Sequence, residues 1–478
     1  MNLKLCLKIL GYVLLIETAT LLIPILASFY YKEDLNPFLY TMLFSLFFGI
    51  ILSKLKAAGR FYIRDGYFTV GMIWIITCIV GALPFYFSGY FVSFIDCFFE
   101  SASGFTTTGA TILTDIEVLP KGLLLWRSFT HWLGGMGVLI LATAIMPVFD
   151  INTKYLAVAE SPGPMFSKLV PKQSETSKIL YCIYIIFTVV LFLLLCMAGM
   201  PWYDALLHSF STAGTGGFSN KNASIAAYDS FAIEMIIAVF MILFAVNFAV
   251  HYLLMTKRHR EAFSSDELCF FGGIVLLSTV LITLNISKQC GSPIDSFRYA
   301  FFHVASIIST TGFATTDWLY WPHFSQMILI LLMFIGGCAG STGGGIKCSR
   351  ILVLLRYIKR EIRVTAHPRV VQIVKLDGQV VKDKTITSIL LFIGAYMAIL
   401  LAAAMIISLD DYSFAVSFSS ALTSISNVGP GLEEVGPVLN FSILSPLSKM
   451  TMAITMIIGR LEVFPILVLL SPGLWRNR

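Results

Sequence analysis

Ten apolar stretches run through this chain, and each is long enough to cross a membrane as a helix. A hydrocarbon core of about 30 Å needs roughly 20 apolar residues in helical form. Only 13% of the residues are charged, whereas soluble domains carry about 25%. This composition excludes an ordinary soluble enzyme, and we expect an all-α polytopic membrane protein with about ten transmembrane helices. The stretches are 5–29, 37–54, 68–92, 123–147, 179–199, 231–255, 269–287, 325–354, 386–408 and 443–471.

The distribution of basic residues predicts the orientation of these spans. Ten spans place both termini on one side, and that side holds 25 Lys and Arg, whereas the opposite loops hold seven. Because positive loops face the cytoplasm, both termini are predicted to be cytoplasmic. The opposite loops carry fifteen acidic residues. An acidic outer mouth would concentrate cations, although the membrane topology alone would also give this excess of acidic residues. The seven outer basic residues are Lys32, Lys121, Arg127, Lys221, Lys288, Arg298 and Lys449.

Four of the outer loops share a hidden repeat. Each contains an apolar segment of about 10–14 residues, too short to span, followed by a turn rich in Thr, Ser and Gly. The segments are FIDCFFESASGFTTTGAT, WYDALLHSFSTAGTGGFS, FRYAFFHVASIISTTGFAT and FAVSFSSALTSISNVGPGL. They align without gaps on Gly109, Gly217, Gly312 and Gly429. The preceding two positions hold Thr107 and Thr108, Thr215 and Gly216, Thr310 and Thr311, and Asn427 and Val428, and six before the glycines stand Ser103, Ser211, Ser306 and Thr423.

The physics of a short helix in a membrane gives this repeat a meaning. Such a helix must end in backbone that lines water or protein, because lipid cannot satisfy its polar groups. A helix that enters from outside points its carbonyl end toward the membrane centre, which favours a cation. A glycine there allows φ > 0 and turns carbonyls inward. Four such turns around one axis would form a ring of oxygens that replaces an ion's water shell, whereas ordinary re-entrant capping loops are the alternative.

A glycine-rich sequence interrupts the eighth span. The sequence GGCAGSTGGGIK cannot sustain a helix, because each glycine costs about 1 kcal/mol relative to alanine. A nucleotide-binding loop is excluded, since the lysine comes one position too late for that motif. The stretch either crosses a cavity beneath the four turns or packs helices closely through small residues. Its residues are Gly336, Gly337, Gly340, Ser341, Thr342, Gly343, Gly344 and Gly345.

Arg460 is the one basic residue well inside a predicted span. A mid-membrane arginine costs about 2.5–3.5 kcal/mol on insertion scales, so it faces a pore or snorkels to the inner interface. Glu462 is a poor partner, because two residues correspond to about 200° around a helix. Three other polar or glycine-rich places could line the same cavity or be ordinary packing: Asn247, His131 and the run Gly134, Gly135 and Gly137.

From about residue 68 to its end, the chain resembles the Trk/Ktr/HKT superfamily of potassium transporters. The resemblance implies four span–pore loop–span repeats around one central pore, and two extra N-terminal spans of the Trk type (TrkH-like). It also implies that residues 336–345 form an intramembrane gate, that Arg460 faces the pore, and that Gly109, where sodium-preferring relatives carry serine, favours K+. The fourth turn, SNVGPG, departs from the Thr-rich pattern of the others. The expected units are 1–66 for the extra spans and 67–148, 149–256, 257–360 and 361–478 for the repeats.

The resemblance therefore implies the pore subunit of a potassium-uptake system in the bacterial inner membrane, conducting K+ and Rb+ inward. The transported ion is K+, and we expect no enzyme activity, no organic cofactor and no nucleic acid. The implied partners are a second copy in a homodimer, a cytoplasmic nucleotide-binding regulatory ring of the TrkA type, and membrane lipid. The basic stretch after the eighth span would face lipid or dock a partner. The alternatives are a sodium-permeable relative, an H+- or Na+-coupled symporter and, more distantly, a membrane-embedded enzyme.

Overall fold

The computed structural model describes residues 2–56, 61–136 and 173–471. These residues are mostly helical, and their strands are the two-residue β1 (Lys375–Leu376) and β2 (Gln379–Val380), paired antiparallel. Within the described part, six helices are long and apolar enough to cross a membrane, and a seventh span results if one bent pair is counted. The predicted all-α polytopic membrane fold is confirmed.

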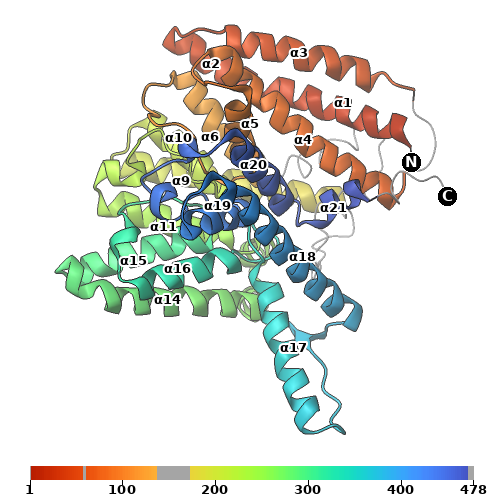
Figure 1. The fold of residues 1–478 in the computed structure, drawn as a ribbon, viewed down its shortest axis with the longest axis vertical. Coiled ribbons are helices and arrows are strands. Elements are labelled where there is room, and N and C mark those ends of the chain that lie inside the picture. The colour runs from red at the N-terminus through yellow and green to blue at the C-terminus, as the bar shows by residue number, and fades with distance from the viewer. Residues whose placement is uncertain (1, 57–60, 137–172, 472–478) are drawn as a thin grey trace.

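The N-terminal helices form a layer on one side of the molecule. The predicted first span is divided at Leu21 into α1 (Leu3–Thr20) and α2 (Leu22–Tyr31). Helices α1, α3 (Asn36–Ser53) and α4 (Ile63–Ser88) pack side by side at the edge of the fold (Figure 1). The two predicted N-terminal spans thus cover the first flanking helix of the first repeat segment.

The four short apolar segments fold as helices that begin and end within their loops. Each packs against the helix before it and the helix after it, so each is enclosed by its own unit. The longest has 16 residues, slightly more than the sequence predicts. The short helices are α5 (Phe94–Phe105), α10 (Trp202–Gly214), α15 (Pro293–Ile308) and α19 (Phe414–Ser426). The helices before them are α4, α9 (Gln173–Met197), α14 (Asp266–Cys290) and α18 (Asp383–Ile407), and those after them are α6 (Lys121–Gly135), α11 (Phe231–Ala245), α16 (His323–Ile335) and α20 (Pro446–Arg460).

Contacts between successive units close into a cycle. Helix α10 packs against α6 of the unit before it, α15 packs against α11, and α19 packs against α16. Helix α5 of the first unit packs against α20 of the last one, which completes the circle. The C-terminal ends of the four short helices therefore converge on one region.

Several predicted spans are broken helices rather than continuous ones. The span 231–255 consists of α11 and α12 (Phe248–Met255), which are bent by 99°. The span 325–354 is divided between α16 and α17 (Cys348–Ala366), and 443–471 between α20 and α21 (Phe464–Leu470). The second half of 123–147, Gly137 and the expected boundary at residue 148 lie outside the described residues.

The basic stretch after the eighth span is helical. Helix α17 projects from the body of the molecule and returns to α18 through β1 and β2 (Figure 1). A small apolar cluster from α17, the strands and α18 holds this extension together. The remaining elements are α13 (His259–Phe263) and the 3-10 turns η2 (Ser224–Tyr228), η3 (Trp318–Tyr320), η4 (Ser408–Asp410), η5 (Glu433–Val435) and η6 (Phe441–Ile443).

Candidate functional site

All four short helices end in the same hydrogen-bonded turn. In each, the N–H two positions before the aligned glycine donates to the carbonyl three residues earlier. The next N–H donates to the carbonyl five residues earlier, with N···O distances of 2.8 to 3.1 Å. This pair of bonds is the Schellman motif, which satisfies the last carbonyls of a helix and reverses the chain. The fourth turn has the same bonds although its sequence departs from the other three.

The residue that reverses the chain is not glycine in any of the four turns. It has φ between 55° and 60° in every case, in the left-handed region. Asparagine tolerates this conformation, but a β-branched residue there is strained by roughly 1–2 kcal/mol. Such strain persists where the surrounding structure enforces it, and it concentrates at functional sites. The residues are Thr107, Thr215, Thr310 and Asn427.

The aligned glycines pack against one another in a closed ring. A Cβ built on Gly109 would lie 1.9 Å from the carbonyl oxygen of Gly216, so only glycine fits. The same contact recurs from each glycine to the next turn and returns from the fourth turn to the first. The Cβ-to-oxygen distances are 2.0 Å from Gly217 to Thr311, 2.2 Å from Gly312 to Val428, and 2.9 Å from Gly429 to Thr108. We call residues 107–109, 215–217, 310–312 and 427–429 the turn ring.

Side chains also join the turns of the ring. The Asn427 amide donates to the Thr108 hydroxyl at 2.9 Å, which links the fourth turn to the first. Thr108 also pairs with Thr106 at 2.8 Å, and Thr311 pairs with Ser309 at 2.7 Å in the third turn. A cavity of about 110 Å³ lies over the ring and is lined by all four aligned glycines. The twelve predicted residues thus lie together in one ring, and its four aligned glycines line the cavity.

In three of the four turns, the small hydroxyl six positions before the glycine binds the chain at or just beyond that glycine, whereas the Ser211 hydroxyl has no hydrogen-bond partner among the described residues. Ser103 donates to the Ala110 carbonyl at 2.6 Å, and Ser306 donates to that of Phe313 at 2.7 Å. Thr423 instead accepts from the Gly429 N–H at 2.8 Å. These three hydroxyls therefore fix the backbone where the first, third and fourth turns leave the ring.

The glycine-rich loop, residues 336–345, lies directly against the turn ring. The Gly344 N–H donates to the Thr310 hydroxyl at 2.7 Å. A Cβ on Gly344 would lie 2.2 Å from the Ser426 carbonyl oxygen, at the end of α19. A residue with a side chain could not approach the end of α19 this closely, so this position requires glycine.

The other side of this loop binds the break between α11 and α12. The Cys338 N–H donates to the Ala245 carbonyl at 2.8 Å, and the Phe248 N–H donates to the Gly340 carbonyl at 3.1 Å. Asn247, a predicted cavity residue, caps α12 through the Ala249 N–H at 2.8 Å and lies beside Gly340. The break frees backbone groups that the loop then pairs.

Glu267 connects the glycine-rich loop to the start of α17. Its Oε1 accepts from the Ala339 N–H at 2.7 Å and from the Ser349 N–H at 2.9 Å. The sequence analysis missed this residue, because it lies in the first turn of α14 and far from the loop along the chain. The signal that could have identified Glu267 is a buried carboxylate close to the glycine-rich segment, and this proximity is visible only once the fold is known.

Arg460 ends α20 and connects the glycine-rich loop to α6. Its guanidinium donates to the Thr342 carbonyl at 2.7 Å and to the Gly134 and Gly135 carbonyls at 2.5 and 2.7 Å. These partners are backbone groups inside the protein. Glu462 pairs with Arg350. It lies beyond the end of α20 with φ of 55°, so the helical spacing assumed for it in the sequence does not apply.

His131 supports the second turn from α6. Its ring stacks on Phe218 with centroids 4.1 Å apart, and it lies against Gly216. The structure thus places His131 beside the turn ring. A further feature that sequence analysis missed is nearby: Arg127, counted there with the outer-loop charges, is buried in an ion pair with Glu100.

Comparison with known proteins gives one consistent result. The family of TrkH cation transport proteins matches residues 36–475. The chain is 37% identical over 481 residues to the Trk system potassium uptake protein TrkH of Salmonella typhimurium, covering 98% of this chain and 99% of that protein. It is equally similar to the protein of that name from Escherichia coli K12. The crystal structure of the potassium transporter TrkH from Vibrio parahaemolyticus matches with a TM-score of 0.89 and 34% identity over all of both chains.

Proposed function

Because the chain belongs to the TrkH family of cation transport proteins, we propose that it conducts K+ and Rb+ inward through the turn ring. In this proposal the ion sheds water among backbone oxygens of residues 107–109, 215–217, 310–312 and 427–429. Entry is from the side of the cavity over the ring, and no covalent chemistry occurs.

One observation carries the proposal: the closed cycle of contacts between each aligned glycine and the carbonyl of the next turn. Filters work by presenting carbonyl oxygens in place of an ion's hydration shell. Four Schellman turns in left-handed conformation supply such oxygens from equivalent positions. The short helices direct their carbonyl ends at the same region, which favours a cation.

The glycine-rich loop is the proposed gate, with Arg460 as its latch. The loop contacts the ends of α15 and α19 and the break after α11, and Arg460 ties it to α6. A guanidinium remains protonated in proteins, so it would also place a fixed positive charge near the path. Opening would require the loop to exchange these bonds for others.

Ion flux through purified protein in liposomes tests the proposal. We expect K+ and Rb+ to pass, with Na+ and Li+ much slower. Equal flux of Na+ would favour the sodium-permeable alternative. Flux that depends on an H+ or Na+ gradient, at fixed K+ gradient and voltage, would favour coupled symport.

We also propose an assembly and a cellular location for this protein. The named relatives belong to a Trk system, so we propose a homodimer that works with a cytoplasmic nucleotide-binding ring of the TrkA type. The basic helix α17 is the proposed contact for that ring or for lipid headgroups. We place the protein in the bacterial inner membrane with both termini cytoplasmic. Light scattering with and without the purified ring tests the assembly, and cysteine labelling from each side tests the orientation.

A further inference from the structure

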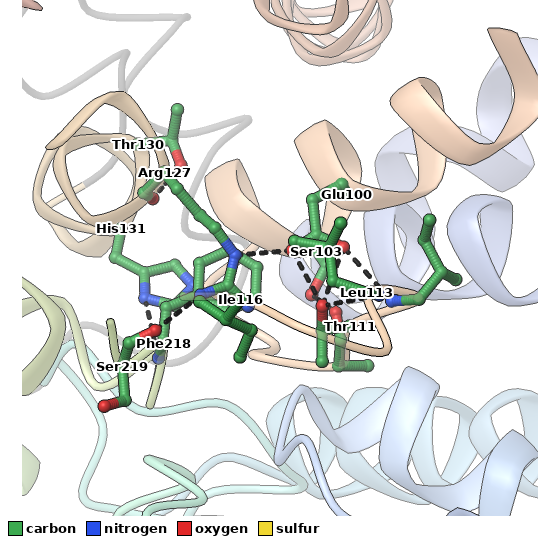
Figure 2. Close-up of polar contacts among 12 residues, drawn as sticks. Glu100, Ser103, Thr111, Leu113, Ile116, Arg127, Thr130, His131, Phe218 and Ser219 are labelled. Carbon is green, nitrogen blue, oxygen red and sulfur yellow. Dashed lines mark hydrogen bonds and ion pairs between the residues drawn. The ribbon is translucent and has the colours of Figure 1, made fainter. Parts of the chain in front are cut away.

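A buried ion pair joins the first and second turns of the ring on the side of the cavity. Arg127 Nε lies 2.5 Å from Glu100 Oε1, and the two side chains are 2% and 0% exposed. Figure 2 shows Arg127 extending from α6 between Glu100 and the segment that carries Phe218 and Ser219. These partners belong to different units of the cycle, so the pair connects the two units.

Each charged group holds the chain just beyond one aligned glycine. Glu100 accepts from the Thr111 hydroxyl at 3.0 and 3.1 Å and from the Ile112 N–H at 3.2 Å, two and three residues after Gly109. Arg127 donates to the Ser219 carbonyl at 2.8 Å, two residues after Gly217. The bonds therefore fix where both turns leave the ring.

Aromatic packing supports the second turn from the same helix. The Arg127 guanidinium lies 3.5 Å from the centroid of Phe218, and His131 stacks on that ring as well. Phe218 directly follows Gly217, so its position and the position of the glycine move together. Arg127 and His131 of α6 thus contact the second turn through Phe218, and Arg127 also contacts Glu100, which binds the chain after the first turn.

The same position in the other short helices shows what is particular to the first. Nine residues before the aligned glycines stand Glu100, His208, His303 and Ser420. His208 Nε2 lies 3.0 Å from the Ser219 hydroxyl, and His303 Nε2 lies 3.1 Å from the Thr316 carbonyl oxygen. These contacts tie a short helix to its own following segment. Among these four positions in the described chain, Glu100 is the charged one, and its partner Arg127 reaches the next unit through the Ser219 carbonyl.

We propose that Glu100 and Arg127 are positioning residues that set the spacing of the first and second turns and thereby the preference for K+ over Na+. This inference rests on the proposed filter. A ring that discriminates against the smaller ion must resist contraction around it. A buried pair with further hydrogen bonds on both partners resists such movement, because neither charge can be left unpaired at low cost.

The test compares K+ and Na+ flux in liposomes, normalised to assembled protein, for three variants. Glu100→Gln/Arg127→Gln removes both charges, so no unpaired charge remains in the interior. Arg127→Lys keeps the charge but loses the planar fork that reaches Glu100 and Ser219 together. Glu234→Gln is the control, since buried Glu234 pairs with partly buried Arg298 at 2.7 Å between α11 and α15, at their outer ends.

We expect the K+/Na+ flux ratio to fall about tenfold in the double variant and by less in Arg127→Lys, with the control unchanged. K+ should also raise the melting temperature of these two variants less than that of the wild type. A wild-type ratio in either variant, once assembled, would overturn the inference. If the wild-type protein itself does not prefer K+, the proposed filter fails first. If the wild type prefers K+ and these variants keep the wild-type K+/Na+ flux ratio, the proposed filter stands and the proposed role of the pair is wrong.

Discussion

The backbone N–H of Gly344 donates a hydrogen bond of 2.7 Å to the hydroxyl of Thr310. Gly344 belongs to the glycine-rich loop, and Thr310 is the strained, left-handed residue of the third turn of the ring. The proposed gate is therefore bonded to the proposed filter itself, not to a separate wall of the cavity. A change in one can reach the other through a single side chain.

Replacement of Thr310 by valine should release the loop. Thr310→Val keeps the shape and the β-branch, but the Gly344 N–H loses its acceptor, which costs about 1–3 kcal/mol when the group stays buried. We expect K+ flux to rise about tenfold or less, because the closed arrangement is the one that loses the bond. Flux in liposomes measures this. Thr107→Val is the control, since the Thr107 hydroxyl is buried without a hydrogen-bond partner in the described structure.

A side chain on Gly109 should abolish discrimination between K+ and Na+. A Cβ there would meet the Gly216 carbonyl oxygen at 1.9 Å, so Gly109→Ser must displace the second turn. We expect the K+/Na+ flux ratio to approach one while the protein still assembles. Gly89→Ser separates this effect from backbone strain, because Gly89 has a similar φ of 73° and nothing within 4 Å of its Cβ position. An unchanged ratio in Gly109→Ser would remove this residue from the filter.

Arg460 offers a test of charge against hydrogen bonding. Arg460→Gln removes the charge and most of the bonds to Thr342, Gly134 and Gly135, so flux should increase severalfold. Arg460→Lys keeps the charge, but one ammonium group cannot bridge the loop and α6 as the guanidinium does. We therefore expect the ion flux of Arg460→Lys to lie between that of Arg460→Gln and that of the wild type. The measurement is ion flux per assembled protein. If Arg460→Gln shows wild-type flux, Arg460 is a structural anchor and not part of the gate.

The sequence predicts the membrane fold, and it marks the twelve residues that the structure places together in the ring, because both depend on local patterns. Apolar length marks the spans, and the aligned glycines and hydroxyls mark turns whose bonds lie within eight residues. The left-handed conformation of Thr107 and its counterparts was not predicted, since threonine rarely adopts it. Broken spans were predicted only where glycines gather. The break before Asn247 depends on pairing with the loop near Gly340, a contact between distant parts of the chain.

Long-range side-chain partners are the part that the sequence could not supply. Arg127 seemed an outer-loop charge, but the structure buries it against Glu100. Glu267 stood at the start of a predicted span like many helix-capping acids, and only the fold brings it to Ala339 and Ser349. These pairings depend on how the units close into a cycle, and no local spacing encodes that closure.

Glu267 gives the last prediction, because it ties the glycine-rich loop to the start of α17. Glu267→Ala removes the acceptor of the Ala339 and Ser349 N–H groups, each worth about 1.5–3 kcal/mol as a bond to a charged group. The hydrogen bonds lost with Glu267 go to the loop and to α17, and the bond from Gly344 to Thr310 of the ring is kept, so the K+/Na+ flux ratio should stay at the wild-type value. K+ flux should increase severalfold and the melting temperature should fall, because the loop loses its anchor in the closed arrangement. Glu261→Ala is the control, since Glu261 forms an exposed pair with Arg258. If Glu267→Ala lowers the flux ratio instead, the loop shapes the filter and is not a separate gate.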